Sequence, residues 1–136
     1  MREDFVDAVL TIAAMVPAGS AVAYSDISDL LQSAGPRQVG SVMSHYGSSV
    51  PWWRVLRASG EAPQGHESQA LAHYLAEGTP LRGDFDNYLR TGEGRWKVDF
   101  RTARWAPTEE NFAAVDQLAE ALRSRTAKLS QADGEL

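Results

Sequence analysis

The feature that most restricts the fold of this chain is a pair of short helical segments joined by a turn that contains glycine. Ser25 is expected to cap a helix over residues 26–32, and Gly35-Pro36 opens a second helix that runs through about His45. Two short helices about four residues apart are typical of a helix-turn-helix. Helix pairs occur in many domains, so this pattern by itself predicts an architecture and no function.

The other periodic segments predict a mostly helical chain with a small β element. Apolar residues recur at helical spacing over residues 3–16 and 67–77, and again from Phe112 to Leu122. Short extended runs are expected at residues 21–23, 55–56 and 95–100. Residues 82–92 carry no clear pattern, and a polar end expected to be disordered begins at Ser130.

The composition excludes several classes of site. Of the 136 residues none is cysteine, which excludes disulfides, thiolate metal ligands and a cysteine nucleophile within this chain. The three histidines lack a ligand spacing, and there is neither a glycine-rich phosphate loop nor a nucleophile elbow. We therefore expect no catalytic residue, no metal, no cofactor and no membrane span, and an intracellular, cytoplasmic protein.

Charge is distributed unevenly along the chain. The net charge is −5 at pH 7, which argues against binding nucleic acid by bulk charge alone. Residues 81–106, however, carry six basic and four acidic side chains, and residues 20–60 carry three basic and two acidic ones. An anion-binding face built from the middle of the chain is consistent with this distribution.

The most unusual local feature is Pro51-Trp52-Trp53-Arg54. Two adjacent tryptophans cannot both face one side of an element, so at least one is expected at a surface or in a cleft. Both could anchor the core, since aromatic side chains bury large areas. Alternatively, one could form a stacking wall for a flat ligand such as a nucleobase, with Arg54 orienting the segment or meeting phosphate.

The helix pair contains further residues with two interpretations each. Arg37, in the first turn of the second helix, is either a solvated surface arginine or a side chain that points into nucleic acid. Tyr24 either belongs to the core or presents its hydroxyl to a phosphate. Gly40 and Ser41 are small enough to let a backbone or duplex approach closely, and Gly40 costs about 1 kcal/mol of helix propensity, so a packing reason is expected.

In combination, these motifs resemble the DNA-binding domain of the O6-alkylguanine-DNA alkyltransferases, and more closely the alkyltransferase-like proteins. The resemblance extends over residues 3–107 and rests on segments in the same order. They are residues 16–27 with Tyr24, residues 37–43 beginning at Arg37, Val50-Pro51-Trp52-Trp53-Arg54-Val55-Leu56 with the turn 58–60, and residues 94–107.

The resemblance implies a winged-helix-like domain of the alkyltransferase C-terminal type, residues 1–107, followed by a C-terminal helical extension, residues 108–136. It implies a DNA-binding set, which is Tyr24, Ser25, Arg37, Gln38, Gly40 and Ser41. It implies a lesion pocket lined by Tyr24, Trp52, Trp53, Arg54, Val55, Ser59 and Gly60.

In the family's Pro-Cys-His-Arg motif the cysteine accepts the alkyl group, and the resemblance places Trp52 at that position and Trp53 at the histidine. An indole replaces neither a thiolate nor a histidine base, so a non-enzymatic protein is expected. The implied function is to bind double-stranded DNA as a monomer, to flip O6-alkylguanine and to flag it for nucleotide excision repair proteins. The roles implied are rotation of the target phosphate for Tyr24, replacement of the flipped base for Arg37 and a structural role for Glu77.

Some positions depart from the family pattern. Gly47-Ser48-Ser49 stands where active alkyltransferases have a Gly-Asn-Pro hinge, and residues 62–65 carry no basic residue of the kind that contacts the lesion in some relatives. Two other classes of function remain open. One is a protein–protein interaction domain that uses the tryptophan pair or the last helix, and the other is a catalyst of unrelated chemistry.

Overall fold

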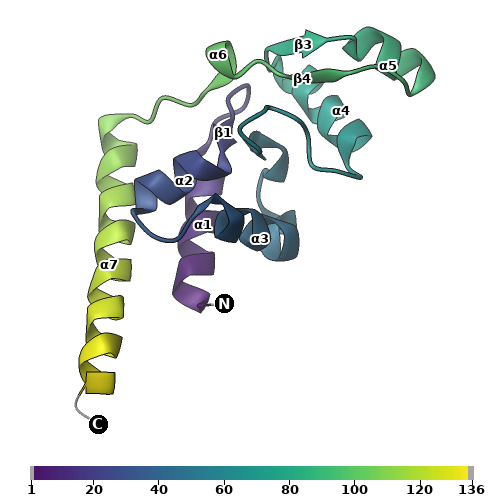
Figure 1. Ribbon diagram of the computed structural model, residues 1–136. Helices are drawn as coiled ribbons and strands as arrows, with labels where there is room; N and C mark the ends of the chain where they lie inside the picture. The colour runs from purple at the N-terminus through teal and green to yellow at the C-terminus, as the bar shows by residue number, and fades with distance from the viewer. Residues whose placement is uncertain (1, 135–136) are drawn as a thin grey trace.

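The computed structural model describes residues 2–134, and the side chains of residues 2–125. It is mostly helical with two small sheets (Figure 1). The helices are α1 (Glu3–Met15), α2 (Tyr24–Leu31), α3 (Pro36–Tyr46), α4 (Glu67–Glu77), α5 (Phe85–Thr91), α6 (Phe100–Ala103) and α7 (Glu109–Gly134). The remaining elements are the 3-10 turns η1 (Gly47–Ser49) and η2 (Trp52–Arg54) and the strands β1 (Val22–Ala23), β2 (Val55–Leu56), β3 (Leu81–Gly83) and β4 (Trp96–Val98).

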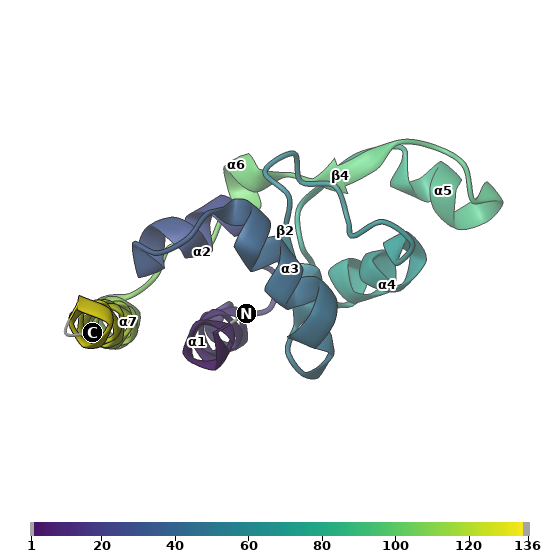
Figure 2. The ribbon, with the colours of Figure 1, turned by 60° about the horizontal axis from the view of Figure 1, so that its bottom comes forward.

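The larger hydrophobic core lies among α1, α2, α3 and α7. α1 contributes Val9 and Ile12, both fully buried, because the apolar positions of this helix fall on one face. α7 packs against α1 and α2, and its Val115 and Leu122 belong to the same buried cluster (Figures 1 and 2). The last helix therefore completes the core of the helical part, whereas the division of the chain at residue 107 stays a prediction.

The pairing of β1 with β2 joins the helix pair to the tryptophan segment. The two strands are parallel, with Val22 opposite Val55 and Ala23 opposite Leu56. Because both strands run in the same direction, their C-terminal ends lie side by side. The residues that follow them, Tyr24 and Arg57, therefore leave the sheet at the same end. The strand expected at residues 55–56 is confirmed.

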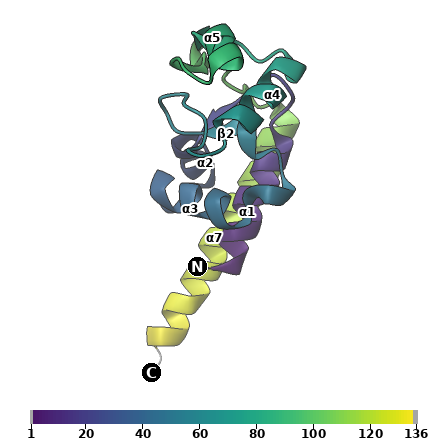
Figure 3. The ribbon, with the colours of Figure 1, turned by 90° about the vertical axis from the view of Figure 1, so that its right-hand side faces the viewer.

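β3 and β4 form an antiparallel hairpin whose connection contains α5 (Figure 1). The extended run expected at residues 95–100 is confirmed in its central part, and β3 and α5 fall in the stretch without a clear pattern. α4 and the hairpin connection α5 lie at one end of the molecule, and the C-terminal end of α7 lies at the opposite end (Figure 3).

The helix ends follow local sequence signals except at one cap. The predicted glycine cap and first-turn proline of α3 are confirmed, and the Gln38 side chain accepts a hydrogen bond from the Gly35 N–H (3.1 Å). The cap expected at Ser25 is wrong, because α2 already begins at Tyr24 and Asp26 accepts a hydrogen bond from the Ala23 N–H (2.9 Å).

At the C-terminal end, α7 continues through Gly134. It therefore extends beyond Ser130, where a disordered end was expected, and the last two residues of that expected end lie outside the described chain. No helix in residues 2–134 combines the length and the apolar character needed to cross a membrane.

Candidate functional site

A cavity of about 650 Å³ lies between the helix pair and the segment that follows β2. Three of the residues expected to form the pocket line it, namely Tyr24 from the start of α2, Trp52 from η2 and Val55 from β2. Gly40 of α3 forms part of the opposite wall. Three predicted segments that are separated in the sequence thus meet around one hollow.

Trp52 is the aromatic wall of this cavity. Its indole is partly buried and packs against the His66 ring (centroids 5.6 Å apart) and edge-on against Trp53 (5.7 Å, 88°). These contacts hold the ring in place from the side of α4. As expected for adjacent tryptophans, the two indoles face different sides, since Trp52 lines the cavity and Trp53 does not.

Trp53 is directed away from the cavity and does not line it. Its ring stacks on His73 (3.6 Å, 5°), and its Nε1 donates a hydrogen bond to Glu77 Oε1 (3.0 Å). Arg54 also lies outside the cavity: Nη2 reaches Glu77 Oε1 (2.5 Å), and Nη1 donates to the Val16 carbonyl (2.8 Å). These two residues attach η2 to α4 and α1.

Glu77 accepts hydrogen bonds from three directions. Burial would raise its pKa, but the hydrogen bonds from Arg54, Trp53 and the Gly19 N–H outweigh it, so the pKa lies below the ordinary value. The carboxylate is therefore ionised at neutral pH. It serves as the anchor of the tryptophan segment, which agrees with the structural role expected of it.

Ser59 and Gly60 form a turn beyond the cavity and do not line it. Ser59 is exposed, whereas Gly60 is buried with φ +85° and accepts a hydrogen bond from the Val98 N–H (2.9 Å). A Cβ at Gly60 would lie 2.5 Å from the Val98 carbonyl oxygen. This glycine is required for the close approach of the turn to β4.

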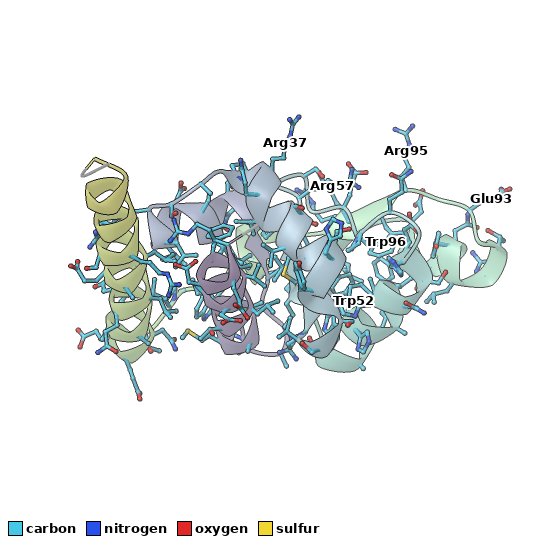
Figure 4. The ribbon with its side chains drawn as sticks, turned by 90° about the horizontal axis from the view of Figure 1, so that it is seen from below. Arg37, Trp52, Arg57, Glu93, Arg95 and Trp96 are labelled. Carbon is cyan, nitrogen blue, oxygen red and sulfur yellow. The ribbon has the colours of Figure 1, made fainter. Side chains whose placement is uncertain are left out.

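The structure places Arg37 in the first turn of α3 with its side chain extended away from the molecule (Figure 4). Among the residues with described side chains it forms no ion pair. Gln38 is exposed and caps α3, and Ser25 is partly exposed in the first turn of α2. Ser41, one turn into α3, has its carbonyl oxygen 2.8 Å from His45 Nδ1.

Gly40 has the packing reason that its low helix propensity suggests. A Cβ at this position would lie 3.3 Å from Tyr24 Cε2, so the glycine lets the tyrosine ring lie flat against α3. Burial raises the pKa of Tyr24, and the nearby Arg57 charge partly opposes this. The phenol is therefore protonated at neutral pH and able to donate a hydrogen bond.

The sequence analysis did not predict several of the residues that line the cavity, among them Arg57 and His66. Arg57 is exposed. Its Nη2 lies 3.7 Å from Glu61 Oε2 and donates a hydrogen bond to the Ala62 carbonyl (3.4 Å). It supplies a cation that residues 62–65 lack. Its position directly after the predicted strand was a signal, but only the parallel pairing of β1 and β2 places it beside Tyr24.

Comparisons with known proteins agree with this arrangement. The sequence model of one family, described as "6-O-methylguanine DNA methyltransferase, DNA binding domain", matches residues 4–77. A search of curated proteins finds no match to this chain.

Three solved structures share the fold. S. pombe Atl1 in complex with damaged DNA containing O6-carboxymethylguanine is 24% identical, with a TM-score of 0.63 over 79% of this chain and 100% of that one. S. pombe ATL in complex with DNA is 25% identical, with a TM-score of 0.61 and the same coverage. A variant of the M. tuberculosis O6-methylguanine methyltransferase is 26% identical over 65% of this chain and 56% of that one, with a TM-score of 0.50.

The family model covers more than half of the chain and includes every residue that lines the cavity. This chain belongs to the family of the 6-O-methylguanine DNA methyltransferase DNA-binding domain.

Proposed function

We propose that this protein binds double-stranded DNA and holds a flipped O6-alkylguanine in the cavity beside Trp52, without transferring the alkyl group. The observation that carries the proposal is the position of the Trp52 indole as one wall of a 650 Å³ cavity that also contains Tyr24 and Arg57. Cavities of this size suit a flat ligand such as a nucleobase. Similar structures, those of the S. pombe relatives, hold DNA.

The chemistry of the cavity supports binding rather than alkyl transfer. The chain contains no cysteine, so no thiolate can displace the alkyl group from O6. The resemblance assigns the acceptor position to Trp52, whose indole offers a face for stacking instead. Trp53, at the position of the family's histidine, donates its N–H to Glu77 and has no basic nitrogen to activate a nucleophile.

Tyr24 and Arg37 are suited to the flipping step. Extruding a base from a duplex costs a few kcal/mol, and the cost is lower where the pair is already weakened by alkylation. The Tyr24 phenol, at the cavity edge, would contact the phosphate of the target nucleotide. The exposed Arg37 guanidinium would enter the minor groove, as arginines do in other DNA-binding proteins, and take the place of the extruded base.

Ser25, Gln38, Gly40 and Ser41 would face the duplex together with Arg37, as a helix-turn-helix. The bound complex would then flag the lesion for nucleotide excision repair proteins. A monomeric state and a cytoplasmic location stay predictions from the sequence.

The proposal is tested by competition binding with two duplexes that differ only in one O6-methylguanine. We expect tighter binding to the alkylated duplex and, after incubation, no gain in protein mass and an unchanged lesion. Equal affinities would remove the lesion-binding role, and a methylated protein would remove the non-enzymatic one. Absence of any salt-sensitive DNA binding, with a protein partner recovered instead, would favour the interaction-domain alternative.

A further inference from the structure

A second hollow, of about 840 Å³, lies between the segment after β2 and the β3–β4 hairpin. We call it the hairpin groove. Four basic side chains line it, which are Arg57, Arg82, Arg95 and Lys97. Two acidic side chains, Glu61 and Glu67, also line it, so the groove carries an excess of positive charge in a protein whose net charge is −5.

The register of the hairpin places two of these cations directly opposite each other. Arg82 on β3 pairs with Lys97 on β4. Side chains of directly opposed residues project from the same face of an antiparallel pair, and like charges in this arrangement destabilise it. Neither residue forms an ion pair with any side chain in residues 2–125. The fold thus places these two cations opposite each other at a cost, and no described carboxylate pairs with either of them.

Arg95, the residue directly before β4, lines the same groove and adds a third cation near these two. The opposite face fixes the hairpin to the domain: Trp96 packs edge-on against Tyr74 of α4 (6.0 Å) and Tyr88 of α5 (5.7 Å). The cations are consequently presented on an anchored support, which lowers the entropy lost when they bind a charged partner.

The hairpin groove adjoins the cavity beside Trp52, since Arg57 lines both. Arg37, Arg57 and Arg95, from α3, the segment after β2 and the hairpin, all point to the same side of the molecule (Figure 4). Duplex DNA presents a regular row of phosphates along such a face. The hairpin itself lies outside residues 4–77, the part matched by the family model.

We propose that the hairpin groove binds backbone phosphates of the DNA duplex beside the lesion cavity, through Arg82, Arg95 and Lys97. This inference rests on the proposed DNA-binding function and extends its surface from α3 to the β3–β4 hairpin. Phosphate contacts position a protein on the duplex and carry no sequence or lesion information. The groove therefore contributes equally to binding of damaged and undamaged DNA.

The test compares two double variants that each remove two positive charges. Arg82→Gln/Lys97→Gln removes two of the four groove cations. Arg90→Gln/Arg101→Gln, at exposed positions that do not line the groove, is the matched control. Affinity for an undamaged duplex and for the same duplex with one O6-methylguanine is measured between 50 and 200 mM salt. The slope of log K against log salt is negative, and each lost phosphate contact makes it less steep by about 0.9.

We expect the slope of the groove variant to be less steep than that of the unaltered protein by about 1.8, with an unchanged ratio of affinities for the two duplexes. Because opposed like charges are removed, its unfolding temperature should not fall. The control variant should keep the slope of the unaltered protein.

Equal slopes for both variants would overturn the groove assignment while leaving lesion binding in place. If the groove variant shows the reduced salt dependence but the unaltered protein binds both duplexes equally, the groove assignment is supported and the lesion cavity is contradicted. If the unaltered protein binds neither duplex, both proposals are wrong. An unchanged DNA slope, together with binding of a polyglutamate peptide that Arg82→Gln/Lys97→Gln abolishes, would assign the groove to an acidic protein segment instead.

Discussion

Arg54 and Glu77 form a nearly buried ion pair that joins η2 to the C-terminal end of α4. Arg54 Nη2 lies 2.5 Å from Glu77 Oε1, and the two side chains are 15% and 13% exposed. The same carboxylate accepts the Trp53 N–H. This pair consequently determines which tryptophan faces the cavity: Trp53 is held against α4, and Trp52 is left at the cavity wall.

The first prediction concerns Glu77→Gln, which keeps the shape of the side chain but removes its charge. Leaving the Arg54 guanidinium nearly buried without a counter-ion should destabilise the fold by about 3 kcal/mol at neutral pH. The lowered pKa of Glu77 means that its contribution is present above the ordinary carboxyl pKa of about 4.3 and is lost as the pH falls through the lowered value.

Urea unfolding between pH 3 and pH 7 checks this prediction. The unaltered protein should lose more stability on acidification than Glu77→Gln does, because the variant has no carboxylate to protonate. Parallel curves for the two proteins would show that Glu77 does not anchor the segment.

A second prediction separates the two tryptophans. Trp52→Ala should lower the preference for an O6-methylguanine duplex by about 5- to 150-fold, since stacking on an aromatic wall contributes about 1–3 kcal/mol per base. Trp53→Phe keeps the stack on His73 and loses only the hydrogen bond to Glu77. We expect it to reduce stability and to leave the lesion preference unchanged, as measured by competition binding. Loss of the lesion preference in Trp53→Phe but not in Trp52→Ala would show that Trp53 contacts the base instead.

Arg37→Ala should weaken binding to both the damaged and the undamaged duplex by about 10-fold or more, because a charged guanidinium that contacts DNA is lost. The unfolding temperature should not change, since Arg37 is exposed and makes no ion pair in the described part of the chain. Arg37→Lys is the control: it keeps the charge and lacks the planar fork, so it should recover only part of the affinity. If Arg37→Ala bound both duplexes with the affinity of the unaltered protein, Arg37 would not take the place of the extruded base.

The last prediction compares two glycines of similar backbone conformation. Gly60 and Gly65 have φ of +85° and +86°, so alanine at either costs about 1–3 kcal/mol of backbone strain. Only Gly60→Ala would also place a Cβ 2.5 Å from the Val98 carbonyl oxygen; at Gly65 nothing lies within 4 Å. Gly60→Ala should therefore lower the urea midpoint clearly more than Gly65→Ala, and equal midpoints would contradict the tight approach of this turn to β4.

The sequence by itself determined the elements that depend on local signals. Gly35-Pro36 begins α3 and Gly78 ends α4, because a proline fixes the first helical turn and a glycine tolerates the left-handed end. The order of the motifs around Tyr24, Arg37 and Trp52 also identified the family, since side-chain chemistry at fixed spacing is visible without coordinates.

Only the tertiary structure decided what the site contains. Tyr24 and Arg57 meet because β1 and β2 pair in parallel, and partners in a sheet are set by packing and not by local propensity. Trp53 and Arg54, expected at the pocket, lie outside the cavity because Glu77, distant in the sequence, binds both. Arg82 and Lys97 oppose each other through a register that short strands do not encode locally, since long-range pairing fixes it.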